Sequence, residues 1–301
     1  MALVQIGRAS ASRLPPRLPE WLRKPETHFG ALHDLKVELR SRGLHTVCES
    51  ARCPNIHECF ARKAATFMIL GNTCTRTCGF CAVPQGSPDD LESDEPEQVA
   101  GMAQRMGLRH VVITSVNRDD LPDGGSAHFA ATVRAVKRAL PRARVEVLVP
   151  DFLGDLDAVA RVLDSGCDVF NHNMETVAWL YPRVRPQAVY ARSLDVLRFA
   201  RRHSPQVLTK SGLMVGLGES AEDVRELLQD LRAAKVDVAT IGQYLQPKRR
   251  RLRVEEYVRP DVFGRYREYG ERLGFRAVFS GPLVRSSYMA ESVEAQALMG
   301  Q

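Results

Sequence analysis

From residue 65 onward, short apolar segments alternate with longer segments whose apolar residues recur at helical spacing. The short segments are typical of buried strands. We expect strands over 66–70, 110–116, 145–149, 168–171, 207–215, 236–241 and 276–280. The longer segments predict amphipathic helices. We expect these helices over 95–106, 129–140, 156–164, 192–202, 221–234 and 261–273.

This alternation predicts an α/β fold, because strands separated by helices form parallel sheets with right-handed crossovers. Six or more such units favour a partial (β/α)6 TIM-like barrel, with a doubly wound open sheet as the alternative. Residues 65–280 would form the barrel. Residues 1–64 and 281–301 would be N- and C-terminal extensions over the barrel mouth.

Composition and charge narrow the classes of protein to which this chain could belong. At 301 residues, with 44% hydrophobic and 26% charged residues, the chain is typical of a globular protein. It has no apolar run long enough to span a bilayer, and residues 1–25 lack the apolar segment of a secretory signal. We therefore expect a cytoplasmic protein without a membrane partner.

The net charge of +6 is mildly basic. Its densest part is the basic run at residues 248–253, with the sequence Lys-Arg-Arg-Arg-Leu-Arg. A solvated loop is the simplest interpretation, and an acidic partner is the more specific one. No nucleic-acid-binding motif accompanies the run, so we expect no nucleic acid partner.

Polar clusters follow several of the predicted strands. Catalytic groups of a barrel lie on the loops at the C-terminal ends of its strands. Any one cluster could be an ordinary loop, but several on one rim predict a functional site. These clusters lie at 74–81, 114–120, 171–175, 216–219 and 243–246.

Six of the seven cysteines form two triplets of different spacing. The first has the pattern C-x4-C-x5-C and the second C-x3-C-x2-C. Thiolates this close together usually hold metal, and iron–sulfur clusters suit them best. A triplet leaves one iron of a four-iron cluster open to another ligand. The triplets are Cys48, Cys53 and Cys59, then Cys74, Cys78 and Cys81.

Three other interpretations compete. Disulfides fit poorly, because the cysteine count is odd and the thiols crowd into one segment. Zinc stays open, since His45 and His57 lie near the first triplet and could complete a zinc site. A buried free thiol suits Cys167 alone, which begins an apolar segment.

The second triplet, with Phe80 before its last cysteine, resembles the signature of radical S-adenosylmethionine enzymes. Residues 212–219 resemble a further motif of that superfamily, on its fifth strand. Together with the first triplet and the Arg-Ser-Ser-Tyr sequence at 285–288, the match narrows to the lipoyl synthase family. The resemblance extends over about residues 18–290.

The resemblance implies an enzyme that inserts two sulfur atoms, at C6 and C8, into an octanoyl chain on a carrier-protein lysine. These C–H bonds are unactivated, so a cofactor must supply a radical. The second triplet would hold a [4Fe-4S] cluster that cleaves S-adenosylmethionine. The first triplet would hold an auxiliary [4Fe-4S] cluster that donates sulfur, with Ser287 as its fourth ligand. From the residues alone, Ser287 and its neighbour could equally be a helix N-cap before 289–298.

The resemblance also suggests contacts to S-adenosylmethionine, each with an ordinary structural alternative. Phe80 would pack on the adenine or belong to the core. Asn173 and Glu175 would hydrogen-bond the ribose or amino group, or cap a turn. Arg192 would pair with the carboxylate or lie on a helix surface. Ser115 is a further candidate of the same kind.

The implied partners are octanoylated lipoyl carrier domains, namely 2-oxoacid dehydrogenase E2 subunits and the glycine cleavage H protein. A low-potential electron donor and an iron–sulfur assembly or repair protein are also expected. The basic run could dock an acidic carrier domain. Two other functions stay open: a radical S-adenosylmethionine enzyme acting on a free small molecule, and a non-enzymatic metal-binding or electron-transfer protein.

Overall fold

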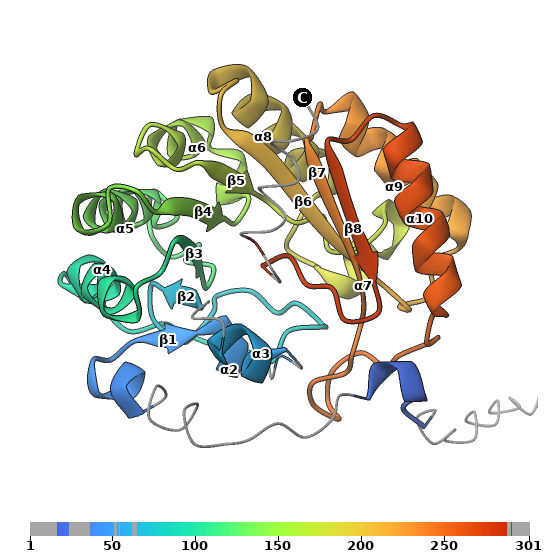
Figure 1. The fold of residues 1–301 in the computed structure, drawn as a ribbon, viewed down its shortest axis with the longest axis horizontal. Helices are drawn as coiled ribbons and strands as arrows, with labels where there is room; N and C mark the ends of the chain where they lie inside the picture. The colour runs from blue at the N-terminus through green and yellow to red at the C-terminus, as the bar shows by residue number, and fades with distance from the viewer. Residues whose placement is uncertain are drawn as a thin grey trace, which may run out of the picture.

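A single curved sheet organises the part of the chain that this computed structural model describes, residues 17–23, 37–50, 53, 55–61, 65–287 and 290. Its strands follow one another in chain order (Figure 1). They are β1 (His45–Thr46), β2 (Thr66–Ile69), β3 (His110–Ser115), β4 (Arg144–Leu148), β5 (Val169–Asn171), β6 (Leu208–Val215), β7 (Val238–Gln243) and β8 (Ala277–Gly281).

The helices lie on the outer side of the curved sheet (Figure 1). The six that connect successive parallel strands are α4 (Glu95–Met106), α5 (Ser126–Ala139), α6 (Leu156–Leu163), α8 (Tyr190–His203), α9 (Ala221–Ala233) and α10 (Pro260–Arg272). Shorter elements are α2 (Val47–Ser50), α3 (Ile56–Ala61), α7 (Tyr181–Val184) and the 3-10 turns Glu20–Leu22, Phe152–Gly154 and Ala178–Leu180.

The predicted partial (β/α)6 barrel is confirmed. Strands β2 to β8 are parallel, and the sheet stays open between its edge strands β1 and β8. Every predicted strand and helix after residue 65 is present, with ends shifted by a few residues at most. The division into a barrel and two extensions stays a prediction.

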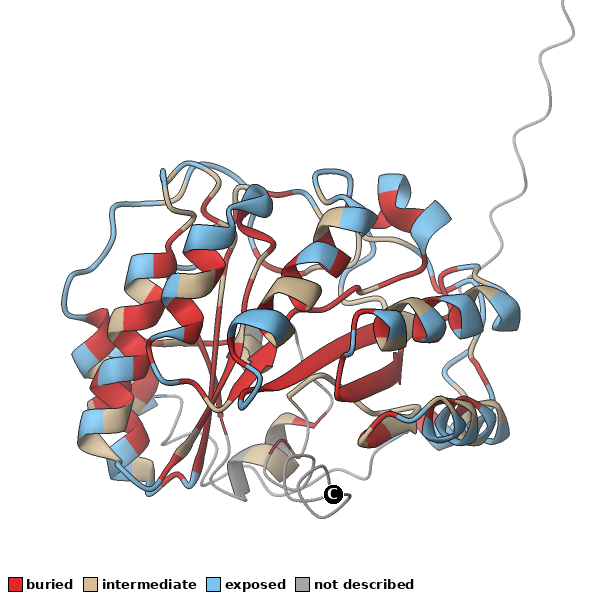
Figure 2. Ribbon diagram, turned by 90° about the horizontal axis from the view of Figure 1, so that it is seen from above, coloured by how far each residue is buried: buried red, intermediate tan, exposed pale blue. Residues whose placement is uncertain are grey.

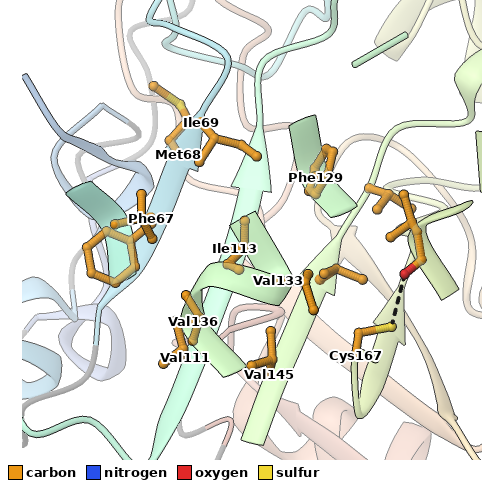
Figure 3. Close-up of a cluster of buried hydrophobic side chains, with 14 of the residues drawn as sticks. Phe67, Met68, Ile69, Val111, Ile113, Phe129, Val133, Val136, Val145 and Cys167 are labelled. Atoms are coloured by element: carbon orange, nitrogen blue, oxygen red, sulfur yellow. Dashed lines mark hydrogen bonds between the residues drawn. The ribbon is translucent and has the colours of Figure 1, made fainter. Parts of the chain in front are cut away.

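Apolar periodicity explains why the helices cover the sheet. On α5, Phe129, Val133 and Val136 recur at helical spacing and are fully buried. They belong to one core cluster with Val111 and Ile113, alternate residues of β3 (Figure 3). The covering helices are red on their inner faces and pale blue on their outer faces in Figure 2. Burial of these faces is the main stabilising contribution.

The other face of the strands lines the barrel interior, where the structure places a charged pair. The Lys210 ammonium on β6 lies 2.9 Å and 3.1 Å from the two carboxylate oxygens of Glu146 on β4. Although burial opposes the charged form of Glu146, attraction by Lys210 lowers its pKa to about 2. The pair contributes stability above the ordinary glutamate pKa of about 4.3, and this stability is lost as the pH falls toward 2.

Strand β1 was not predicted. Its two residues pair antiparallel with β2, His45 opposite Met68 and Thr46 opposite Phe67. A two-residue strand has no periodicity to detect. As a consequence, the segment that carries the first cysteine triplet begins at the sheet edge, directly beside the strand that precedes the second triplet.

Candidate functional site

A cavity of about 570 Å³ lies at the C-terminal ends of the parallel strands. The prediction that the polar clusters would gather on one rim is met here for the loops after β2, β3, β5 and β7. The candidate site residues that line the cavity are Cys48, Cys53, Cys74, Cys78, Phe80, Cys81, Ser115, Asn173, Glu175 and Ser287.

The loop that carries the second triplet closes on itself beyond β2. The Cys74 amide donates to Pro84 O at 2.9 Å, and the Gly86 amide donates back to Cys74 O at 3.0 Å. Cys81 N donates to Cys78 O at 3.3 Å within the loop. These backbone bonds hold the loop without help from the first triplet.

The environment of the Cys74 sulfur fits a thiolate ligand. Three N–H donors point at it: Arg76 N at 3.4 Å, Asn117 N at 3.3 Å and Asn117 Nδ2 at 3.8 Å. Such donors stabilise negative charge on sulfur and tune iron–sulfur sites. Since Asn117 follows β3, two neighbouring strands together create this sulfur site.

Burial disfavours the thiolate form of Cys48, Cys78 and Cys81. It raises the pKa of Cys48 to about 12 and that of Cys78 to about 11, and it also raises the pKa of Cys81. These thiols are therefore neutral at pH 7 unless a bound cation stabilises the thiolates. Their chemistry suits metal ligands better than free nucleophiles.

No three His, Cys, Asp or Glu side chains of the described residues converge closely enough to hold a single metal ion. Thiolates that bind different irons of one cluster stand farther apart than ligands around one ion. The side chain of His57, a candidate zinc ligand, lies outside the described residues.

Two cysteines of the first triplet, Cys48 and Cys53, line the same cavity. Cys48 is on α2 and is buried, and the Cys53 amide donates to Cys48 O at 3.0 Å. Cys59 is on α3, where its amide donates to Asn55 O at 2.9 Å. Cys59 packs against the core cluster and is not among the cavity-lining residues.

The two adjacent serines of the Arg-Ser-Ser-Tyr sequence have different surroundings. The Ser286 hydroxyl accepts from Asn173 Nδ2 at 2.7 Å and donates to Asn173 Oδ1 at 2.9 Å. The Ser287 hydroxyl forms no hydrogen bond with another described residue and lies in the cavity lining. Except for Ala290, the helix that these serines could cap lies outside the described residues.

Unpaired buried donors suit a polar cofactor in this cavity. The Ser115 hydroxyl and the Arg185 Nε are buried without a hydrogen-bond partner among the described residues. Both residues line the cavity. Because burying an unpaired polar group costs about 1–3 kcal/mol, a ligand with carboxylate or hydroxyl oxygens would satisfy them by accepting their hydrogen bonds. The residues present therefore fit S-adenosylmethionine.

Asn173 and Glu175 form a turn beyond β5 that is held firmly. The Glu175 backbone has a φ of 66°, and its amide donates to Gly212 O at 2.9 Å. Asn173 Nδ2 donates to Glu175 Oε1 at 3.0 Å, and burial raises the pKa of the Glu175 carboxyl. Arg185 Nη1 donates to the backbone oxygen of Asn173 at 2.9 Å and so fixes the turn further.

Two arginines differ from the expected arrangement. Arg192 is not among the cavity-lining residues, and its guanidinium lies 3.2 Å from Asp151 Oδ2. Its contact to S-adenosylmethionine stays a prediction. Arg185, which sequence reasoning missed, does line the cavity. It follows the short helix α7, and no periodic signal marked that segment.

His172 was also missed, although it lies in the cavity lining. Its Nδ1 is 2.9 Å from Val149 O and its Nε2 is 3.0 Å from Ser193 Oγ, so both ring nitrogens are occupied. Burial lowers its pKa to about 4, and the ring is neutral at pH 7. It therefore orients neighbouring segments instead of exchanging protons.

The described helices include none whose length and apolar character would let it cross a membrane.

Residues 68–231 match the family model described as the radical SAM superfamily. A lipoyl synthase of Rubrobacter xylanophilus is 55% identical over 282 residues, which are 94% of this chain and 88% of that protein. A lipoyl synthase of Thermus thermophilus is 52% identical over 301 residues, with coverage of 99% and 93%.

Solved structures agree at the level of the fold alone. Methylornithine synthase (PylB) has a TM-score of 0.54 at 15% identity, covering 78% of this chain and 81% of that one. HydG, a maturase of the [FeFe]-hydrogenase, has a TM-score of 0.55 at 12% identity, covering 69% and 48%.

Proposed function

Because the chain belongs to the lipoyl synthase family of the radical S-adenosylmethionine superfamily, we propose that it inserts sulfur at C6 and C8 of a carrier-bound octanoyl chain. It is an enzyme that uses S-adenosylmethionine and a [4Fe-4S] cluster. The observation that carries the sulfur-insertion proposal is the shared cavity: Cys48 and Cys53 line it together with the complete second triplet.

In this proposal Cys74, Cys78 and Cys81 hold the cluster at which S-adenosylmethionine binds. When bound, that cluster supplies the electron that breaks the sulfonium carbon–sulfur bond and so generates the radical. Ser115, Asn173 and Glu175 hold the polar groups of S-adenosylmethionine, and Phe80 packs on its adenine. The barrel wall around them excludes water and keeps the reacting atoms close together.

The second part of the proposal is the auxiliary [4Fe-4S] cluster on Cys48, Cys53 and Cys59, with Ser287 as the fourth ligand. Support comes from Ser287, whose hydroxyl lies in the cavity lining without a hydrogen bond to a described residue. Oxygen is a harder ligand than thiolate and suits iron–sulfur sites less well. A weaker fourth bond is appropriate for a cluster that gives up sulfur.

The segment after β7 covers the loop of the second triplet. Leu252 N donates to Gly79 O at 3.0 Å, and Lys248 Nζ donates to Ala82 O at 2.9 Å. A Cβ at Gly79 would lie 2.8 Å from the Leu252 side chain, so a larger residue there would have to displace Leu252. Lys248 and Leu252 of the basic run thus help to hold the cysteine loop in place.

Mass spectrometry tests the function directly. An octanoyl-lysyl peptide incubated anaerobically with the reconstituted protein, a reductant and S-adenosylmethionine is expected to gain two thiol groups. Analysis should find about eight iron and eight sulfide per chain, four for each of two clusters. Cleavage of S-adenosylmethionine without a thiolated peptide would point to a different radical enzyme. Zinc with little iron would contradict the proposal altogether.

The partner class follows from the reaction and from the remaining basic residues. Arg249, Arg250 and Arg253 are exposed and form no ion pair with a described residue. Residues 244–247 lead directly from the cavity lining to these arginines. We therefore infer that an octanoylated carrier domain with an acidic surface docks beside the cavity. We expect two further partners. A low-potential electron donor would reduce the cluster that cleaves S-adenosylmethionine, and an iron–sulfur assembly or repair protein would rebuild the auxiliary cluster after it gives up sulfur.

Reversing these charges tests the docking surface. Each exposed charge contributes about 0.5 kcal/mol, and Glu both removes an attraction and adds a repulsion. Replacing Arg249, Arg250 and Arg253 with Glu should therefore weaken binding of an octanoylated carrier domain about a hundredfold. The dependence of Kd on salt should also flatten. Isothermal titration calorimetry at low and high salt measures both.

A matched control reverses three exposed cations at the other end of the barrel. Arg142, Arg202 and Lys235 precede the N-terminal ends of strands β4, β6 and β7 and are exposed. Their replacement with Glu changes the net charge equally and should leave the affinity close to the parent value. Equal effects of the two triple variants would reject a local docking surface in favour of a net-charge effect.

A further inference from the structure

Residues 282–287, called here the C-terminal strap, connect the end of β8 to the cavity. Two hydrogen bonds hold the strap through its backbone: Gln243 N donates to Pro282 O at 3.3 Å and Asn55 Nδ2 donates to Leu283 O at 2.7 Å. A Cβ at Gly242 would lie 2.0 Å from Val284 O, so β7 and the strap backbone are in close contact. Backbone anchors of this kind do not depend on the side chains of the strap.

The anchor at the end of the strap is different, because it uses a side chain. Ser286 exchanges two hydrogen bonds with the Asn173 amide group, at 2.7 Å and 2.9 Å. Gly212 on β6 provides the space: a Cβ there would lie 2.8 Å from Ser286 Oγ and 2.9 Å from Asn173 Oδ1. The chain thus keeps a position free of side-chain atoms where these two groups meet.

The partner of Ser286 is itself immobilised. Asn173 Nδ2 also donates to Glu175 Oε1, and the Asn173 carbonyl accepts from Arg185 Nη1. Arg185 Nη1 further donates to Met174 O at 3.1 Å and to the Tyr181 hydroxyl at 3.2 Å. Ser286 is therefore tied to a rigid, buried turn, and the position of the strap end follows from that turn.

Ser287 is the next residue, and its hydroxyl has no hydrogen bond to another described residue. Since one peptide unit joins the two serines, fixing Ser286 restricts where the Ser287 hydroxyl can lie. We propose that Ser286 is a positioning residue: its paired hydrogen bonds to Asn173 hold Ser287 at the auxiliary cluster site. This inference rests on the proposed function, in which Ser287 is the fourth ligand of that cluster.

One consequence concerns the link between the two halves of the site. Asn173 belongs to the turn that we assign to S-adenosylmethionine, whereas Ser287 belongs to the auxiliary site. The Ser286 contact joins them through side-chain hydrogen bonds across the cavity. Loss of this contact would remove the side-chain anchor next to Ser287, and a weak oxygen ligand on a less restrained segment exchanges readily with solvent or buffer.

Mössbauer spectroscopy of the auxiliary site alone tests the proposal. In full-length chain with Cys74, Cys78 and Cys81 changed to Ala, reconstitution with 57Fe loads only the auxiliary cluster, at about four iron per chain. The parent of this series should show one iron of the four with an oxygen ligand. Ser287→Ala should remove that signature, and Ser286→Ala should remove most of it at unchanged iron content. Ser286→Thr keeps the hydroxyl and should restore it.

Two further variants make the test independent of the serine itself. Asn173→Ala removes the partner and should have the same effect as Ser286→Ala. Ser280→Ala is the matched control, because the Ser280 hydroxyl on β8 is buried without a hydrogen-bond partner among the described residues. Its spectrum should equal that of the parent.

The outcomes separate this inference from the proposed function. An unchanged spectrum for Ser286→Ala, beside a changed one for Ser287→Ala, overturns the positioning role and leaves the proposed ligand intact. A change in Ser286→Ala alone identifies Ser286 as the ligand and overturns the inference. A parent spectrum without an oxygen-ligated iron removes the ligand role of Ser287 and the inference with it. Loss of iron in Ser286→Ala but not in Ser287→Ala assigns Ser286 to cluster assembly and also overturns it.

Discussion

Replacing Cys78 with Ala should abolish the cleavage of S-adenosylmethionine to 5′-deoxyadenosine. Cys78 lies in the self-closed loop beyond β2 and lines the cavity with Cys74 and Cys81. Two remaining thiols cannot hold a four-iron cluster in the arrangement that leaves one iron open for S-adenosylmethionine. Anaerobic incubation with reductant, followed by chromatography of 5′-deoxyadenosine, measures the loss.

Cys167 provides the matched control for this substitution. It lies in the core beside α6, where its thiol donates to Val162 O at 3.8 Å (Figure 3). It does not line the cavity, and burial raises its pKa to about 12, so it is a neutral buried thiol. Cys167→Ala should cost about 1 kcal/mol of stability and leave cleavage close to the parent rate. Retained cleavage in Cys78→Ala would refute the role of the second triplet.

Replacing Cys48 with Ala should separate the two halves of the reaction. The auxiliary cluster would be lost, and iron should fall from about eight to about four per chain. No dithiolated octanoyl-lysyl peptide should form, whereas S-adenosylmethionine cleavage should continue. Cleavage persists because the second triplet is held by its own loop, through the bonds of Cys74 to Pro84 and of Gly86 to Cys74.

One reaction mixture gives both measurements for Cys48→Ala, mass spectrometry of the peptide and chromatography of 5′-deoxyadenosine. A dithiolated peptide from this variant would show that the sulfur has another source. Loss of cleavage together with loss of product would show that the two triplets form one interdependent site. Either result would contradict the division of labour between them.

Much of the fold could be predicted because local apolar spacing dictates which face of an element is buried. The expected helix at 95–106 coincides with α4, and the expected strand at 110–116 with β3. β1 could not be predicted, since two residues carry no periodicity and their pairing with β2 depends on distant parts of the chain. α7 was missed for the same reason, since four residues are too few for a helical pattern.

The candidate site, too, could be predicted from the sequence only where local patterns determine it. Cysteine spacing identified both triplets, because ligands that are close in sequence must be close in space. Spacing did not reveal that Cys48 and Cys53 line one cavity with the second triplet, because that depends on β1 joining the sheet edge. Nor could spacing predict which arginine lines the cavity. Helix α8 directs Arg192 to Asp151, whereas the turn after α7 brings Arg185 into the cavity lining.

The two adjacent serines show most clearly what the sequence alone cannot predict. As letters in the chain, Ser286 and Ser287 are equivalent, and either could cap a helix or bind iron. The family resemblance singled out Ser287 as a ligand, but the task of Ser286 emerged only where β6 and the turn after β5 bring Gly212 and Asn173 against the strap. The order of apolar residues and the spacing of cysteines determined the barrel and the class of chemistry, since both act over a few residues. The tertiary structure decided that the Ser286 hydroxyl bonds to Asn173 whereas the Ser287 hydroxyl has no hydrogen bond to a described residue, because that depends on contacts between residues more than a hundred positions apart.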